Sequence, residues 1–192
     1  MQSLSFAVEY AWRTAAEEAL QAGAESIAPM HLLIGVCSIE KFFYQEKPTQ
    51  LSGYALAALR FEWQEFVTRL TAAGSSPSAL RRAGREALHF KPGVKATKNV
   101  KMSRSKESKA LFDRADAIAK AAGSTVLGLV YLFQAMIEKD GPISELLSAQ
   151  NVNLEKLRES TLEASKRPLQ PPNLKDLQSA SAEVSFPPPG SR

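Results

Sequence analysis

The sequence predicts an all-α fold made of two four-helix repeats, packed as one compact domain about a pseudo-twofold axis. Two internal alignments predict it: residues 5–36 match residues 105–136 without a gap, and residues 66–87 match residues 143–164 at an offset of 77. A four-helix unit of this size would leave one apolar face uncovered, so we expect the two repeats to pack against each other. In the first alignment, six identities fall on expected cap, small-contact and core positions: Ser5/Ser105, Ala15/Ala115, Ala19/Ala119, Ala22/Ala122, Gly23/Gly123 and Leu32/Leu132.

Each repeat is predicted to begin with a helical hairpin. In the first copy, Ser5 is a favourable N-cap, because its hydroxyl can accept a free backbone N–H of the first turn. Gly23 is placed to end that helix in a left-handed conformation, and Pro29 suits the first turn of the next helix. The alanines between them should let the two helices approach closely. The expected inward face of the first helix consists of Val8, Ala11, Trp12, Ala15, Ala19 and Ala22.

Between the hairpin and the third helix, the first repeat contains 23 residues that the second repeat lacks, within residues 38–64. Pro48 and Gly53 interrupt this segment, and residues 55–61 are expected to form an added helix. Its aromatic side chains have two open interpretations: they cover the core, or they extend a docking surface. These aromatic residues are Phe42, Phe43, Tyr44, Tyr54, Phe61 and Trp63.

The remaining helices are predicted from caps and stops. In repeat one, Gly74 ends the third helix, and Ser76 with Pro77 begins the fourth. In repeat two, Asn151 ends the third helix in a left-handed conformation and Asn153 caps the fourth. The predicted ranges are 63–73 and 76–90 in repeat one, and 142–150 and 154–166 in repeat two.

Charge and proline content predict the boundaries of the domain. Seven basic residues and one acid lie between Lys91 and Lys109, whereas the rest of the chain has 17 basic and 19 acidic residues. Such a segment is typical of a solvated linker, although nucleic-acid binding through Lys91–Lys109 remains an alternative that a steep salt dependence would reveal. Six prolines in residues 167–192 indicate a flexible tail or tether. The expected organisation is a double domain at 1–166, comprising repeat one at 4–90 with an insertion near 38–64, a basic linker at 91–103 and repeat two at 104–166.

Chemistry-bearing residues are sparse, and we expect a non-enzymatic protein with no cofactor and no metal. The chain has no Gly-x-x-x-x-Gly-Lys-Ser/Thr phosphate loop and no evident pairing of nucleophile and base. Cys37 is predicted to be a buried thiol, His31 a structural histidine near a helix start, and Glu17 and Glu18 surface charges. The single cysteine and the lack of a secretory or membrane-spanning segment favour a cytoplasmic location.

The order of these features resembles the double-repeat N-terminal domain of Clp-type AAA+ unfoldases. The first repeat of that family runs Phe-Thr, Glu-Glu-Ala, Gly or His, and then Ile-Gly-Thr-Glu-His-Leu-Leu. The second repeat of this chain follows the same order more loosely, and the resemblance extends from Leu4 to about Lys166. The matching residues are Leu4-Ser5, Glu17-Glu18-Ala19, Gly23 and 27–33 in repeat one, and Ser105, Gly123 and 127–133 in repeat two.

The resemblance implies a non-catalytic module that binds protein substrate segments or an adaptor protein. The ATPase that it serves would lie in the same chain or another; a free-standing accessory protein that regulates a Clp machine is the alternative. Met30 and Val130 stand where the family has acids that pair with phosphorylated arginine or cationic segments, so an apolar peptide or helix is the expected guest. By position, the resemblance places the peptide- or adaptor-binding surface at Leu4, Ser5, Phe6, Met30, Arg104, Lys109, Ser124 and Val130.

Overall fold

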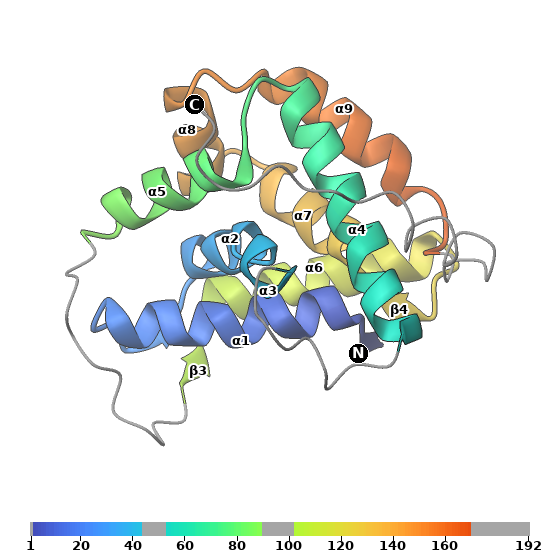
Figure 1. Ribbon diagram of the computed structural model, residues 1–192, viewed down its shortest axis with the longest axis horizontal. Coiled ribbons are helices and arrows are strands. Elements are labelled where there is room, and N and C mark those ends of the chain that lie inside the picture. The colour runs from blue at the N-terminus through green and yellow to red at the C-terminus, as the bar shows by residue number, and fades with distance from the viewer. Residues whose placement is uncertain (1, 44–52, 90–101, 170–192) are drawn as a thin grey trace.

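The computed structural model describes residues 2–43, 53–89 and 102–169 of the chain (Figure 1). Over these residues the protein is helical, with four strands of two residues each. The predicted all-α class is therefore confirmed. In chain order the elements are β1 (Ser3–Leu4), α1 (Phe6–Gln21), β2 (Ser26–Ile27), α2 (Pro29–Cys37), α3 (Glu40–Phe43), α4 (Gly53–Ala72), α5 (Pro77–Ala87), β3 (Ser103–Arg104), α6 (Lys106–Ala121), β4 (Val126–Leu127), α7 (Leu129–Ile137), α8 (Pro142–Ala149) and α9 (Leu154–Ser165).

The elements repeat as the alignments predict. β1, α1, β2 and α2 begin and end 100 residues before β3, α6, β4 and α7, and α5 begins 77 residues before α9. The expected stops are present as well, since Gly23 and Gly123 have φ angles of 69° and 72°. Asn151 is left-handed, as predicted, with a φ angle of 57°. The duplication is thus confirmed at the level of individual elements.

The short strands join the two repeats by exchange. β1 pairs in parallel with β4, and β2 pairs in parallel with β3, so the first strand of each repeat pairs with the second strand of the other. The backbone hydrogen bonds directly after the paired strands are equivalent in the two repeats: Ser5 N donates to Leu127 O and Ser105 N donates to Ile27 O, both at 3.0 Å. The two repeats are therefore related by a pseudo-twofold axis.

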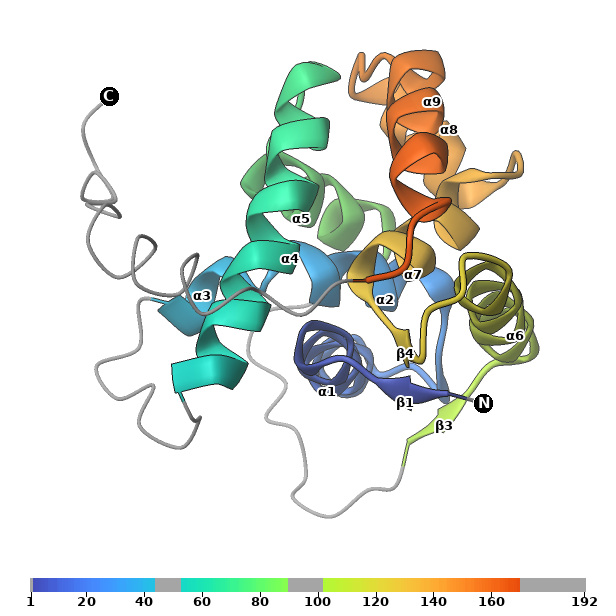
Figure 2. The same ribbon diagram turned by 90° about the vertical axis from the view of Figure 1, so that its right-hand side faces the viewer.

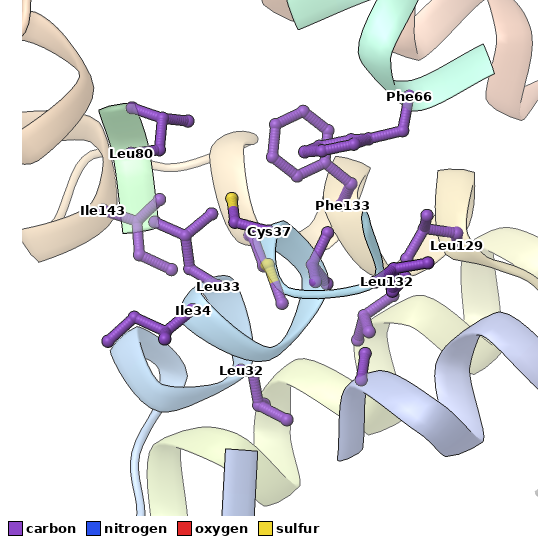
Figure 3. Close-up of a cluster of buried hydrophobic side chains, with 14 of the residues drawn as sticks. Leu32, Leu33, Ile34, Cys37, Phe66, Leu80, Leu129, Leu132, Phe133 and Ile143 are labelled. Carbon is purple, nitrogen blue, oxygen red and sulfur yellow. The ribbon is translucent and has the colours of Figure 1, made fainter. Parts of the chain in front are cut away.

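α2 and α7 lie at the centre of the molecule. α1 and α6 lie on one side of them, and α4, α5, α8 and α9 lie on the other (Figures 1 and 2). The third helices cross between the repeats: α4 packs on α7 and α9, while α8 packs on α2 and α5. Figure 3 shows Leu33 of α2, Leu80 of α5 and Ile143 of α8 together in this core. The apolar face of each repeat is covered by the other.

Small residues bring α1 and α2 into close contact, as the alanine pattern predicts. Ala11, Ala15 and Ala19 are completely buried. A Cβ atom on Gly35 would lie only 2.2 Å from the backbone oxygen of Ala11, so no larger residue fits there without a shift of the helices.

Several predicted boundaries of the first repeat are wrong. Residues 53–72 form one helix of 20 residues, α4, so neither a separate helix over 55–61 nor a start of the third helix at 63 is present. No glycine or proline occurs between Tyr54 and Ala72, and the sequence therefore has no stop at the position where two helices were expected. Part of the insertion lengthens the third helix at its N-terminus, because α4 has 20 residues and α8, its counterpart, has 8. α5 ends at Ala87, three residues earlier than predicted.

The prediction that Glu17 and Glu18 are both surface charges is wrong for Glu18. Glu17 is exposed, but Glu18 is buried between α1 and α5. Arg85 of α5 donates through Nε to Glu18 Oε2 at 2.9 Å, and its terminal nitrogen forms an ion pair with Oε1. Because neighbouring residues on a helix point about 100° apart, one of two adjacent acids can lie inside the interface.

Three predicted segments lie wholly or partly outside the described residues. They are the central part of the insertion (44–52), the basic linker up to residue 101 and the tail from residue 170. The predicted linker range also overlaps β3, because Ser103 belongs to that strand. Among the helices of the described ranges, none has both the length and the apolar character needed to cross a membrane.

Candidate functional site

The predicted site residues fall at two places related by the pseudo-twofold axis. Leu4, Ser5 and Phe6 belong to β1 and the start of α1, and Ser124 and Val130 flank β4, which pairs with β1. We call this place the β1–β4 end. Ser5 and Ser124 are buried there, whereas Leu4, Phe6 and Val130 are partly exposed. The structure thus brings five of the eight residues together.

The other three residues lie at the β2–β3 end, where β2 pairs with β3. Met30, in the first turn of α2, is only 8% exposed, and its sulfur lies 3.6 Å from the place of a Cβ on Gly84 of α5. Arg104 packs its guanidinium carbon 5.2 Å from the centre of the Phe112 ring. Lys109 is exposed on α6. Met30 is therefore covered, and Arg104 is engaged by an aromatic face.

The β1–β4 end contains two adjoining cavities. The larger, about 390 Å³, lies among α4, α7, α9 and the residues after α9. The smaller, about 360 Å³, lies between α4, the start of α1 and β4. Phe61, Glu62 and Leu169 line both cavities. We call the two together the α4 groove; Phe66, Val130 and Phe133 line the larger part, and Ser5, Phe6 and Tyr54 line the smaller part.

The aromatic residues of the insertion divide between the two interpretations left open by the sequence. Trp63 is buried, and Phe42 packs edge-on against Tyr10 with ring centres 5.3 Å apart, so these two rings cover the core. Tyr54 and Phe61 are 50% and 42% exposed and line the α4 groove. The N-terminal extension of α4 therefore adds aromatic surface to one end of the molecule.

Glu62 is a buried carboxylate that joins two helix starts at the floor of this groove. Its Oε2 atom accepts hydrogen bonds from Ser5 Oγ at 3.0 Å and from Leu129 N at 2.6 Å. The N-cap of α7 is Gly128, which has no side chain to accept any N–H of the first turn. Glu62, from the other repeat, takes its place and also meets the partial positive charge of the helix N-termini.

Burial raises the pKa of the Glu62 carboxyl to about 7, although the hydrogen bonds from Leu129 and Ser5 act in the opposite direction. The floor of the groove therefore changes charge near neutral pH. The sequence interpretation missed Glu62, because it lies within the 38–64 insertion and has no aligned partner in repeat two.

The residues considered for chemistry have structural roles. His31 accepts a hydrogen bond at Nδ1 from Ala28 N at 3.0 Å, and burial lowers the pKa of its imidazole. Cys37 is completely buried, which raises the pKa of its thiol to about 12. Both predictions, a structural histidine and a buried thiol, are confirmed. In the described ranges, no group of three or more His, Cys, Asp or Glu side chains is arranged to hold a metal ion.

No protein-family model matches this sequence, and no curated protein does. Solved structures do match: the chain is similar to the crystal structure of the Hsp104 N-terminal domain from Candida albicans, with a TM-score of 0.60. The match covers 88% of this chain and 98% of that domain, at 12% sequence identity. The chain has the fold of that domain. The fold implied by the resemblance to Clp-type N-terminal domains is thus confirmed, whereas an identity this low gives no information about binding.

Proposed function

We propose that this protein is a non-catalytic protein-binding module that takes apolar polypeptide segments into the α4 groove. One observation carries the proposal: two adjoining cavities, lined by exposed aromatic side chains, lie at the β1–β4 end. Ser5, Phe6 and Val130, three of the residues implied by the resemblance, line them. Concave, largely apolar surface with a few polar groups is typical of binding sites.

The charges around the groove favour an apolar guest. Val130 offers no carboxylate, and Glu62 already accepts hydrogen bonds from the hydroxyl of Ser5 and the backbone N–H of Leu129. Arg69 is paired with Glu65 at 2.5 Å within α4, and Arg167 lies 3.9 Å from Glu163. Because these charged groups already have partners within the protein, binding should depend on apolar contact and weakly on salt.

The guests in this proposal are segments of substrate proteins or an adaptor protein. Two arrangements fit: an N-terminal domain that serves a Clp-type ATPase module in the same or another chain, and a free-standing accessory protein of the same fold. The structural similarity to the Hsp104 N-terminal domain supports both equally.

The test is the binding of fluorescein-labelled β-casein, an unfolded polypeptide, followed by fluorescence anisotropy. Phe61→Asp places a charge on an exposed ring shared by both cavities, and we expect it to weaken binding by about tenfold or more. Leu162→Asp is the matched control, because Leu162 is 47% exposed on α9 but lines neither cavity. It should bind as the parent does.

A salt titration separates this proposal from nucleic-acid binding. Raising the salt fourfold should change casein affinity by less than about threefold, whereas a site that neutralises six or more phosphates would lose a factor of about 10³ or more. Equal casein affinity of Phe61→Asp and the parent, or a steep salt dependence, would refute the proposal.

A further inference from the structure

The segment that follows α9 turns back onto α7 instead of leaving the domain. Figure 2 shows it descending from α9 towards the start of α7 beside β4. Its path is fixed by a hydrogen bond, because the hydroxyl of Tyr131 donates to the backbone oxygen of Arg167 at 2.7 Å. Tyr131 itself is completely buried, so the segment is anchored to the core of the protein.

Leu169 lies between the two cavities and forms part of the wall of both. It is one of three residues that line both, and it is partly buried. Its Cδ2 atom lies 2.7 Å from the place that a Cβ on Gly128 would take. The lack of a side chain at residue 128 thus makes room for the leucine at the point where the two parts of the groove meet.

The segment has the features of a bound peptide. Pro168 restricts the backbone and donates no hydrogen bond, so less conformational entropy is lost when the segment is held in place. It contributes one carbonyl bonded to the protein and, two residues later, one apolar side chain packed where the two cavities meet. Since it is covalently attached to α9, its effective concentration at the groove is in the millimolar range or above.

We propose that Arg167–Leu169 is the resident ligand of the α4 groove, with Leu169 as its anchor, and that an incoming polypeptide binds by displacing it. The guest then presents an aliphatic side chain two residues after a carbonyl that accepts the Tyr131 hydroxyl. Displacement by a guest rests on the proposed function, whereas occupancy of the groove by Leu169 does not.

The experiment uses the full chain and two matched leucine variants. Leu169→Ser removes the anchor, and Leu162→Ser makes the same change on the exposed face of α9. Binding of the dye 1-anilinonaphthalene-8-sulfonate reports apolar surface opened in the groove. We expect Leu169→Ser to increase the dye fluorescence at least about threefold and to tighten β-casein binding about tenfold, because a competitor at millimolar effective concentration is lost. Leu162→Ser should change neither.

Tyr131→Phe provides a second variant that leaves the leucine in place. Loss of one hydrogen bond to Arg167 should tighten casein binding about fivefold. Increased dye fluorescence of Leu169→Ser, with no casein binding by any variant, supports occupancy by Leu169 and refutes the proposed function. Dye and casein binding equal to the parent in both Leu169→Ser and Tyr131→Phe, with parent-like circular dichroism, overturns the inference.

Discussion

The two ends of the molecule share one backbone arrangement but cap their central helices differently. At the start of α2, the N–H of Ala28 donates to His31 of the same helix. At the start of α7, Glu62 from the other repeat accepts the N–H of Leu129, whose equivalent in α2 is Pro29, a residue without an N–H. The residue equivalent to His31 is Tyr131, which bonds the backbone oxygen of Arg167 instead of the start of its own helix.

The same comparison of the two ends explains why the larger cavity lies at the β1–β4 end. Gly84 of α5 lets that helix approach Ile34 and Met30 of α2. Its counterpart on α9, at the offset of 77, is Thr161, which lines the larger cavity together with Val130. A duplicated fold can therefore keep its core and differ in packing at one end through a few positions.

Among substitutions that make the two repeats more alike, Gly35→Ala should have the largest effect on stability. It gives repeat one the alanine that repeat two carries at the equivalent position, Ala135. The added methyl group would meet the backbone oxygen of Ala11, so we expect a loss of about 3 kcal/mol in the free energy of unfolding. Ala135→Gly should cost about 1 kcal/mol. Urea unfolding measures both. An unchanged midpoint for Gly35→Ala would show that α1 and α2 do not depend on close contact.

Glu62→Gln tests the buried carboxyl at the start of α7 through the pH dependence of stability. Burial raises the pKa of Glu62 from 4.5 to about 7, so the folded state keeps a proton that the unfolded state releases in this window. Its contribution to stability is complete below pH 4.5 and is lost as the pH rises through about 7, by roughly 3 kcal/mol. The amide of glutamine still accepts hydrogen bonds but does not titrate.

The measurement is the stability of the parent minus that of Glu62→Gln at several pH values. This difference isolates Glu62 from His31, whose lowered pKa acts with the opposite sign. We expect the difference to fall as the pH rises. A difference independent of pH would contradict the buried, capping role of Glu62.

Replacing Glu18 and Arg85 with the residues at the equivalent positions of repeat two should have a smaller effect on stability. The equivalent residues in repeat two are Ile118 and Leu162. Arg85→Leu alone leaves the buried Glu18 carboxylate without its ion pair and should cost about 2 kcal/mol, below the range for fully buried pairs because Arg85 is partly exposed. Addition of Glu18→Ile should recover stability to within about 1 kcal/mol of the parent. Additive losses in the double variant would argue against the pairing.

The sequence was sufficient for the architecture because duplication constrains the caps and stops. Ser5, Gly23 and Asn153 each act through local backbone geometry, which is readable from residue type and spacing. The proximity of Phe6 and Val130 follows from the pairing of β1 with β4. The internal alignments do not predict it, because the two residues come from different repeats.

Contacts between segments far apart in the chain could not be predicted from the internal alignments. Glu62 and Leu169 lie in segments without an aligned partner, one in the insertion and one after α9. Both side chains lie within 2.9 Å of the place that a Cβ atom on residue 128 would take, so their positions require glycine there. Likewise, the burial of Glu18 depends on an arginine 67 residues away.

The most direct test of the account is amide chemical-shift mapping by NMR on the full chain, with unlabelled β-casein added. Three residues of the open end, Phe6, Gly128 and Val130, have pseudo-twofold equivalents in Lys106, Ala28 and Met30. We predict that the first three amides shift or broaden and that their equivalents do not. Perturbation centred on Lys106, Ala28 and Met30, or spread evenly over both ends, would contradict the account.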